Sequence, residues 1–82
     1  MKSTIKEEHK DKVLARREKV AELIQTARVQ RGWSQTELGE RVGFSQNTIA
    51  RIENLRFSPN ADQLYIILDC LDLPLRINNQ KI

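Results

Sequence analysis

Residues 35–54 constrain the fold most, because they contain two short helical patterns joined by a glycine. Ser34 and Glu37 have the S-x-x-E spacing of a capping box at the start of the first pattern. Gly43 supplies the backbone freedom that a sharp turn requires, and Ser45 is placed to cap the second helix. The spacing therefore predicts two short helices packed through a tight corner. The apolar residues expected inside this corner are Leu38, Val42, Phe44, Ile49 and Ile52.

The second of these helices has a polar face. An amide-rich start followed one turn later by an arginine is suited to reading base edges in a DNA major groove. Gln46 and Asn47 can form paired hydrogen bonds with adenine, and Arg51 can bridge O6 and N7 of guanine. Thr48 or Ala50 can contact a thymine methyl group or the backbone. The alternative interpretation is an ordinary solvated surface.

The stretch resembles the helix-turn-helix of the lambda-type repressor and Cro family, often called Xre-type. The similarity extends upstream as I-x-x-x-R-x-x-x-G-W-S-Q (residues 24–35) and downstream through Ile-Glu-Asn (52–54) and Pro-Asn-x-x-Gln-Leu (59–64). It implies a compact all-α DNA-binding domain of four to five helices. Gly39 is one departure, since the family usually has alanine there, and it should weaken the helix by up to ~1 kcal/mol. Leu55 is another, because glycine is common at that position. Either Asn54 or Leu55 must then adopt any positive φ that the turn requires, and asparagine tolerates that conformation better.

The resemblance also implies which residues hold DNA phosphates. Gln35 matches a family position with that role. The helix amino termini at Ser34 and Ser45 present amides suited to the same task, Ser45 only if its cap leaves amides free. Arg28 and Glu53 match an ion pair that ties two helices together in the family, and we interpret it as scaffold. Further phosphate candidates follow in the next loop: Asn54, Arg56 and Ser58.

Upstream, residues 13–30 repeat apolar side chains at steps of three and four, which predicts a helix ending at Gly32. Trp33 is expected in the core. Residues 1–12 are expected to form a flexible basic segment, in which Thr4 and Glu7 have the spacing to cap an early helix. We favour a frayed, solvated helix or tail over a basic arm that contacts DNA or a partner. The expected apolar stripe of the helix is Val13, Val20, Leu23, Ile24 and Ala27.

Downstream, Asn60 and Gln63 can cap another helix, and the helix-turn-helix domain is expected to span residues 13–72. Residues 73–82 change period and predict a half-buried strand. No other segment predicts a strand, so we expect this one to pair with its two-fold mate in a homodimer. Such an ending also resembles the antitoxins of HipB type, whose terminal strands pair across the dimer. A disordered tail is the alternative. The apolar positions concerned are Leu64, Ile67, Leu68 and Leu71 in the helix, and Leu73, Leu75 and Ile77 in the strand.

Composition and charge limit the classes of function that the chain can have. The 82 residues make one small domain with a net charge of +3, and residues 1–31 hold nine Lys/Arg against five Asp/Glu. This balance is compatible with DNA phosphates as partners. Cys70 and His9 are the only residues of their types, so no internal disulfide, zinc spacing or catalytic constellation can be assembled. We therefore expect no enzyme activity, no metal and no cofactor. No membrane-span-length apolar run or signal peptide is recognisable, which favours the cytoplasm.

These features predict a sequence-specific, double-stranded DNA-binding transcriptional repressor. It is expected to act as a homodimer on a near-palindromic operator, with two reading helices ~34 Å apart. The alternative is the DNA-binding antitoxin of a toxin–antitoxin pair, which also binds and neutralises a toxin protein. A protein–protein adaptor that has kept the fold without binding DNA is a third class, which absent or salt-insensitive duplex binding would favour.

Overall fold

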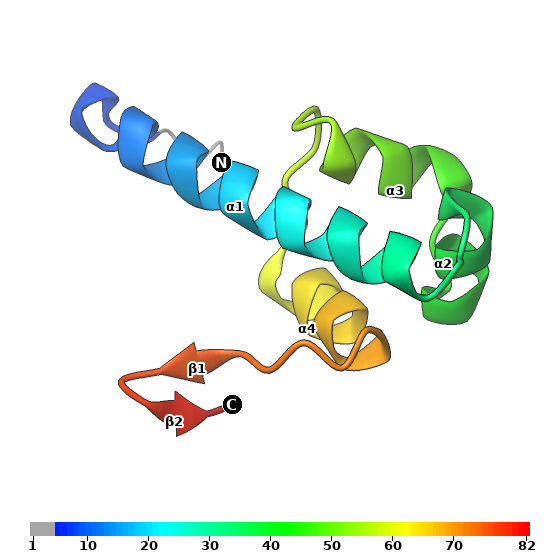
Figure 1. Cartoon of the computed structure of the whole chain (residues 1–82). Helices are drawn as coiled ribbons and strands as arrows, with labels where there is room; N and C mark the ends of the chain where they lie inside the picture. The colour runs from blue at the N-terminus through cyan, green and yellow to red at the C-terminus, as the bar shows by residue number, and fades with distance from the viewer. Residues whose placement is uncertain (1–4) are drawn as a thin grey trace.

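The computed structural model describes residues 5–82 and consists of four helices followed by a small hairpin (Figure 1). The longest helix, α1, crosses the others, and its amino-terminal half extends beyond them. Helices α2 and α3 pack against each other at one end of α1, and α4 lies on the other side of α1 from α3 in this view. This confirms the expected all-α architecture with a short β ending. The elements are α1 (Glu7–Gln30), α2 (Gln35–Val42), α3 (Gln46–Glu53), α4 (Ala61–Cys70), β1 (Arg76–Ile77) and β2 (Gln80–Lys81).

One core joins the four helices. Its fully buried side chains come from every helix and from the residue that follows α4, each at most 2% exposed. Burying an aliphatic side chain of this size contributes about 1.5–3 kcal/mol, so these contacts hold α2 and α3 at a fixed angle. Leu23, which belongs to the predicted apolar stripe of α1, is 45% exposed. The fully buried residues are Ile24, Leu38, Ile49, Ile67 and Leu71.

Helix α1 begins at Glu7, earlier than the apolar pattern predicts. Residues 7–12, expected to belong to a flexible segment, are helical here. Acidic residues in the first turn favour this start through the helix dipole, and Lys10 Nζ lies 2.7 Å from Glu7 Oε2. Apolar periodicity misses these turns because they pack against nothing: between residues 7 and 19, only Val13 and Arg17 are partly buried. The predicted cap residue Thr4 lies outside the described residues.

The chain ends in a two-stranded antiparallel hairpin. Its two-residue turn consists of Asn78 and Asn79, with φ values of 53° and 66°. Asparagine tolerates this left-handed conformation better than most residues, and turns of this kind match the twist of paired strands. The paired residues are Arg76 with Lys81, and Ile77 with Gln80.

This hairpin corrects part of the prediction for the tail. A strand is present as expected, but the inference that its own chain offers no partner is wrong. Gln80–Lys81 supplies that partner, and two polar residues carry no alternation by which a strand could be recognised. Leu73 and Leu75 precede β1 instead of belonging to it, and Ile77 is 62% exposed instead of half-buried.

The turn after α3 shows which of the two candidate residues has the positive φ, and it is not the one that intrinsic preference favours. Asn54 has a φ of −95° as the C-cap residue that follows α3, whereas Leu55 adopts the positive φ of 62°. The amides of Leu55 and Arg56 donate to the carbonyls of Ile52 and Arg51 at 3.2 and 2.8 Å. This pattern closes a helix end with a left-handed residue, usually glycine. Leucine occupies that position here, and its carbonyl accepts a hydrogen bond from Arg17 Nη2 of α1 at 3.0 Å.

Candidate nucleic-acid interface

The corner between α2 and α3 is closed by backbone hydrogen bonds. Gly43 has a φ of 82°, and the amides of Gly43 and Phe44 both donate to the Gly39 carbonyl, at 2.8 and 2.9 Å. A Cβ atom on Gly39 would lie 2.5 Å from the backbone oxygen of Phe44. Gly39 is therefore more than a weakened helix position: the two helices approach too closely here for the alanine that the resemblance implies.

Both short helices have the predicted serine caps. Ser34 Oγ accepts from the amide of Glu37 at 3.0 Å, and Ser45 Oγ accepts from the amide of Thr48 at 3.1 Å. In the part of the chain that the structure describes, the Glu37 side chain does not complete the capping box by accepting from the Ser34 amide. It pairs instead with Arg41, whose Nε lies 3.3 Å from Glu37 Oε2. The complete capping box lies at α4, between Asn60 and Gln63.

Helix α3 presents its predicted base-reading residues unequally. Gln46, Asn47 and Arg51 are exposed, so their side chains are available to a ligand. Thr48 and Ala50 are half-buried, and Thr48 Oγ1 lies 2.9 Å from Ser45 Oγ, within the cap. The opposite face of α3 carries the buried Ile49 and Ile52, which fix the rotation of the helix about its own axis.

A connection that the sequence did not indicate links the two ends of the motif. Gln46 Nε2 donates to Gln35 Oε1 at 2.8 Å, and Gln35 Nε2 donates to Glu53 Oε1 at 3.2 Å. Gln35, a phosphate candidate, therefore orients Gln46, a base-reading candidate. Amide side chains far apart in sequence carry no periodic signal, so only the packing of α2 on α3 reveals the contact.

The Arg28–Glu53 ion pair anchors this connection. Arg28 Nε and Nη2 donate to the two carboxylate oxygens of Glu53 at 2.7 and 2.9 Å, and Arg28 Nη1 donates to the Trp33 carbonyl at 2.8 Å. The side chains are only 10% and 2% exposed. The hydrogen bond to Glu53 raises the pKa of Arg28 above its usual value, against an opposing effect of burial. The pair implied by the resemblance is thus present, with two-pronged geometry.

Trp33 lies beside this pair at the edge of the core. It is half-buried and packs against the core cluster, as expected. The guanidinium carbons of Arg41 and Arg31 lie 4.0 and 5.2 Å from its ring centroid. Cation–π contacts of this kind occupy the ring faces, so base stacking by Trp33 is disfavoured.

The predicted phosphate residues lie at three places: the start of α2, the start of α3 and the loop after α3. Ser34 and Gln35 begin α2, and Ser45 begins α3, where its cap does not use the first-turn amides of Gln46 and Asn47. Such free amides at a helix start favour anions. The remaining candidates, all exposed, lie after α3: Asn54, Arg56 and Ser58. The structure also places Phe57 in that loop with its ring centroid 5.9 Å from Arg51 Cζ, a contact that sequence reasoning missed.

The chain is similar to known helix-turn-helix proteins. The HTH_3 helix-turn-helix family model matches residues 24–78, from α1 to β1. Antitoxin HipB of Escherichia coli K12 and of strain CFT073 (O6:H1) are each 31% identical to the chain over 62 residues. The match covers 76% of this chain and 70% and 66% of the two relatives, so the chain spans about two thirds of their length.

Two solved structures are similar over 94% of both chains. A complex of a HipB variant with an O2 20-mer has a TM-score of 0.66 and 25% identity. A HipA–HipB–O2–O3 complex has a TM-score of 0.65 and 23% identity, which supports the fold alone. Within the described chain, no helix is both long and apolar enough to cross a membrane. The family match and the identity to HipB together show that this chain belongs to the Xre-type helix-turn-helix family of DNA-binding regulators.

Proposed function

We propose that the protein is a sequence-specific repressor that binds double-stranded DNA as a homodimer on a near-palindromic operator. The observation that carries this proposal is the exposed face of α3, where Gln46, Asn47 and Arg51 lie on a helix whose opposite face is locked into the core. Such a helix fits the major groove without rearrangement. The protein acts by occupying DNA, with no chemical step.

In this proposal, the two ends of the motif hold the two phosphate backbones that border the groove. Ser34 and Gln35 bind on one side, and Arg56 with Ser58 binds on the other. Gln46, oriented by Gln35, reads adenine together with Asn47, and Arg51 reads guanine. Thr48 and Ala50, half-buried, supply only close contact with a thymine methyl or the backbone.

The surface of α4 and the tail supports the homodimer. Tyr65 and Ile66 on α4 are 48% and 46% exposed, and Ile77 and Ile82 of the tail are 62% and 67% exposed. Exposed apolar side chains of this kind in a small domain favour association, and two-fold pairing is the commonest solution. A second copy would cover Leu73 and Leu75 as well and bring a second α3 to the same face of the duplex.

Selection of bound duplexes from a random DNA library tests binding, symmetry and spacing together. We expect inverted half-sites whose centres lie about 10–10.5 base pairs apart, or a multiple of that. On the selected operator, Arg51→Ala should lose ~1–3 kcal/mol and relax the preference at one base position. Unchanged binding of R51A to operator and to random DNA would refute the base-reading assignment. Failure of the wild-type protein to enrich any duplex would favour the adaptor class.

A second function is favoured by the relatives, which are antitoxins, and by a solved complex in which HipB is joined by HipA. We propose it as the alternative: a DNA-binding antitoxin that also holds and neutralises a toxin protein. Co-expression with the product of the adjacent reading frame distinguishes the two. Co-purification of the two proteins and relief of growth arrest support an antitoxin, whereas repression without such a partner supports a stand-alone repressor.

A further inference from the structure

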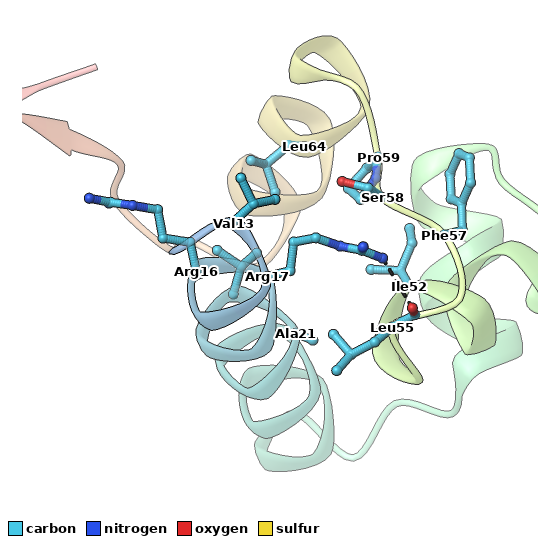
Figure 2. Close-up of a pocket in the computed structure, with 11 residues that line it drawn as sticks. Val13, Arg16, Arg17, Ala21, Ile52, Leu55, Phe57, Ser58, Pro59 and Leu64 are labelled. Carbon is cyan, nitrogen blue, oxygen red and sulfur yellow. Dashed lines mark hydrogen bonds between the residues drawn. The ribbon is translucent and has the colours of Figure 1, made fainter. Parts of the chain in front are cut away.

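We propose that Arg17 on α1 is a positioning residue for DNA binding, because it holds the loop between α3 and α4 in place. This inference rests on the proposed DNA-binding function. Arg17 Nη2 donates to the carbonyl oxygen of Leu55 at 3.0 Å, across 38 positions of sequence. Figure 2 shows the Arg17 side chain reaching from α1 to this carbonyl.

Leu55 needs an external contact because of its backbone conformation. Its φ of 62° lies in the left-handed region, which β- and γ-carbon atoms disfavour and which glycine usually occupies at a helix end. With leucine in that position, the positive φ is energetically unfavourable. The hydrogen bond from Arg17 to the Leu55 carbonyl offsets part of this cost, because it stabilises the peptide group that follows Leu55 Cα.

The side chain of Leu55 is held as well. It points toward α1 near Ala21 and lines an apolar groove of about 200 Å³ between α1 and the loop (Figure 2). Arg17 is half-buried along this groove, whereas the neighbouring Arg16 is exposed and points away. One face of α1 thus fixes both the carbonyl and the side chain of a single loop residue. The other apolar residues around the groove are Val13, Val20, Ile52, Phe57, Pro59 and Leu64.

Residues proposed to bind DNA lie immediately after Leu55. The amides of Arg56 and Phe57 both donate to the Arg51 carbonyl, at 2.8 and 3.2 Å, and the Phe57 ring lies beneath the Arg51 guanidinium. If Leu55 were released, Arg56 would lose its position against phosphate and Arg51 would lose its aromatic support. Arg17 therefore acts through the loop and touches no predicted base-reading residue.

The test compares Arg17→Met with Arg16→Met. Methionine keeps an aliphatic stem along the groove and removes one guanidinium, so the two variants lose equal charge. In the DNA-free protein, we expect the amides of Arg56 and Phe57 to exchange hydrogen ~10-fold faster in R17M and at the wild-type rate in R16M. On the selected operator, R17M should bind ~3- to 10-fold more weakly, and R16M within about twofold of wild type.

Repeating Arg17→Met in a Leu55→Asn variant distinguishes a positioning role of Arg17 from direct contact with phosphate. Asparagine tolerates the left-handed region, so Leu55→Asn should keep the turn without help from α1. The loss caused by Arg17→Met should then be smaller in L55N than in the wild-type chain. An equal loss of DNA affinity in both backgrounds, with the slope of log affinity against log salt reduced by about one phosphate contact, would instead mean that Arg17 binds DNA directly.

Two further outcomes would overturn the inference: unchanged amide exchange in R17M, or equal losses of affinity in R16M and R17M. Failure of the wild-type protein to bind any duplex would refute the proposed function, and the exchange comparison would still decide the role of Arg17.

Discussion

Replacing Gly39 by alanine tests how closely α2 and α3 must approach. In an open helix, Gly→Ala stabilises by up to ~1 kcal/mol through propensity. Here the new Cβ would meet the Phe44 backbone oxygen at 2.5 Å, with the backbone of Ser45 and Gln46 at 3.3 and 3.4 Å. Because ordinary contact lies at 3.4–4 Å, the corner must open by roughly 1 Å. A backbone oxygen cannot turn aside as a flexible side chain can.

Opening the corner has two costs. Overpacking of this kind costs about 1–3 kcal/mol. The two hydrogen bonds that the Gly39 carbonyl accepts from Gly43 and Phe44 are also strained, and each contributes about 0.5–1.5 kcal/mol when intact. Set against the propensity gain, we expect G39A to lower the free energy of unfolding by about 1–2 kcal/mol. For a domain of this size each kcal/mol lowers Tm by roughly 4–8 °C.

Urea and thermal unfolding, monitored by circular dichroism, measure this change. Glu40→Ala is the matched control, because Glu40 neighbours Gly39 on α2 but is exposed, and we expect its stability to stay within about 0.5 kcal/mol of wild type. G39A should also bind operator more weakly at temperatures where it is fully folded, since the corner sets the direction of α3. A rise in stability of about 1 kcal/mol in G39A would show that the corner accepts a methyl group, and the close-approach reasoning would then be wrong.

Three other predictions concern the ion pair, the glutamine contact and the apolar tail. Arg28→Ala leaves Glu53 buried without its partner and should cost about 3–5 kcal/mol in urea unfolding, whereas a cost below 1 kcal/mol would mean that water replaces the guanidinium. Gln35→Ala should weaken binding to all duplexes and also relax the preference at the base read by Gln46, as measured by repeating the library selection; a uniform loss alone would mean that the 2.8 Å contact does not orient Gln46. Ile77→Asp should shift the protein from dimer to monomer in sedimentation equilibrium, and an unchanged mass would place the dimer contact elsewhere.

The helix-turn-helix was predictable because its determinants are local. Ser34 and Ser45 cap helices by contacts three residues away. Gly43 can adopt its left-handed φ without help from distant residues, because it has no Cβ. Ile49 and Ile52 indicate the buried face by their spacing alone. Which side of α3 is buried followed from these signals. The proposed roles of the exposed residues remain predictions.

The parts that sequence reasoning missed depend on contacts between distant segments. Asn54 was the better candidate for a positive φ on intrinsic preference, yet Leu55 adopts it. A left-handed leucine costs about 1–2 kcal/mol, and the partly buried hydrogen bond from Arg17, with the apolar groove, offsets a cost of that size. The second strand was missed for a similar reason. Its residues are exposed and polar, and only the asparagine turn brings them beside β1.

The contacts of Glu53 connect stability with recognition. A buried ion pair is weak evidence for stability by itself, because apolar residues of similar volume are often as stabilising. Apolar replacements, however, could not accept the hydrogen bond that Gln35 donates to Glu53 Oε1 at 3.2 Å. Through that bond, the carboxylate held by Arg28 orients Gln35, and Gln35 orients Gln46 on the reading face. The ion pair thereby helps to fix α3, which we propose reads bases, relative to the start of α2, which we propose binds phosphate. Apolar packing at this position would not supply that connection.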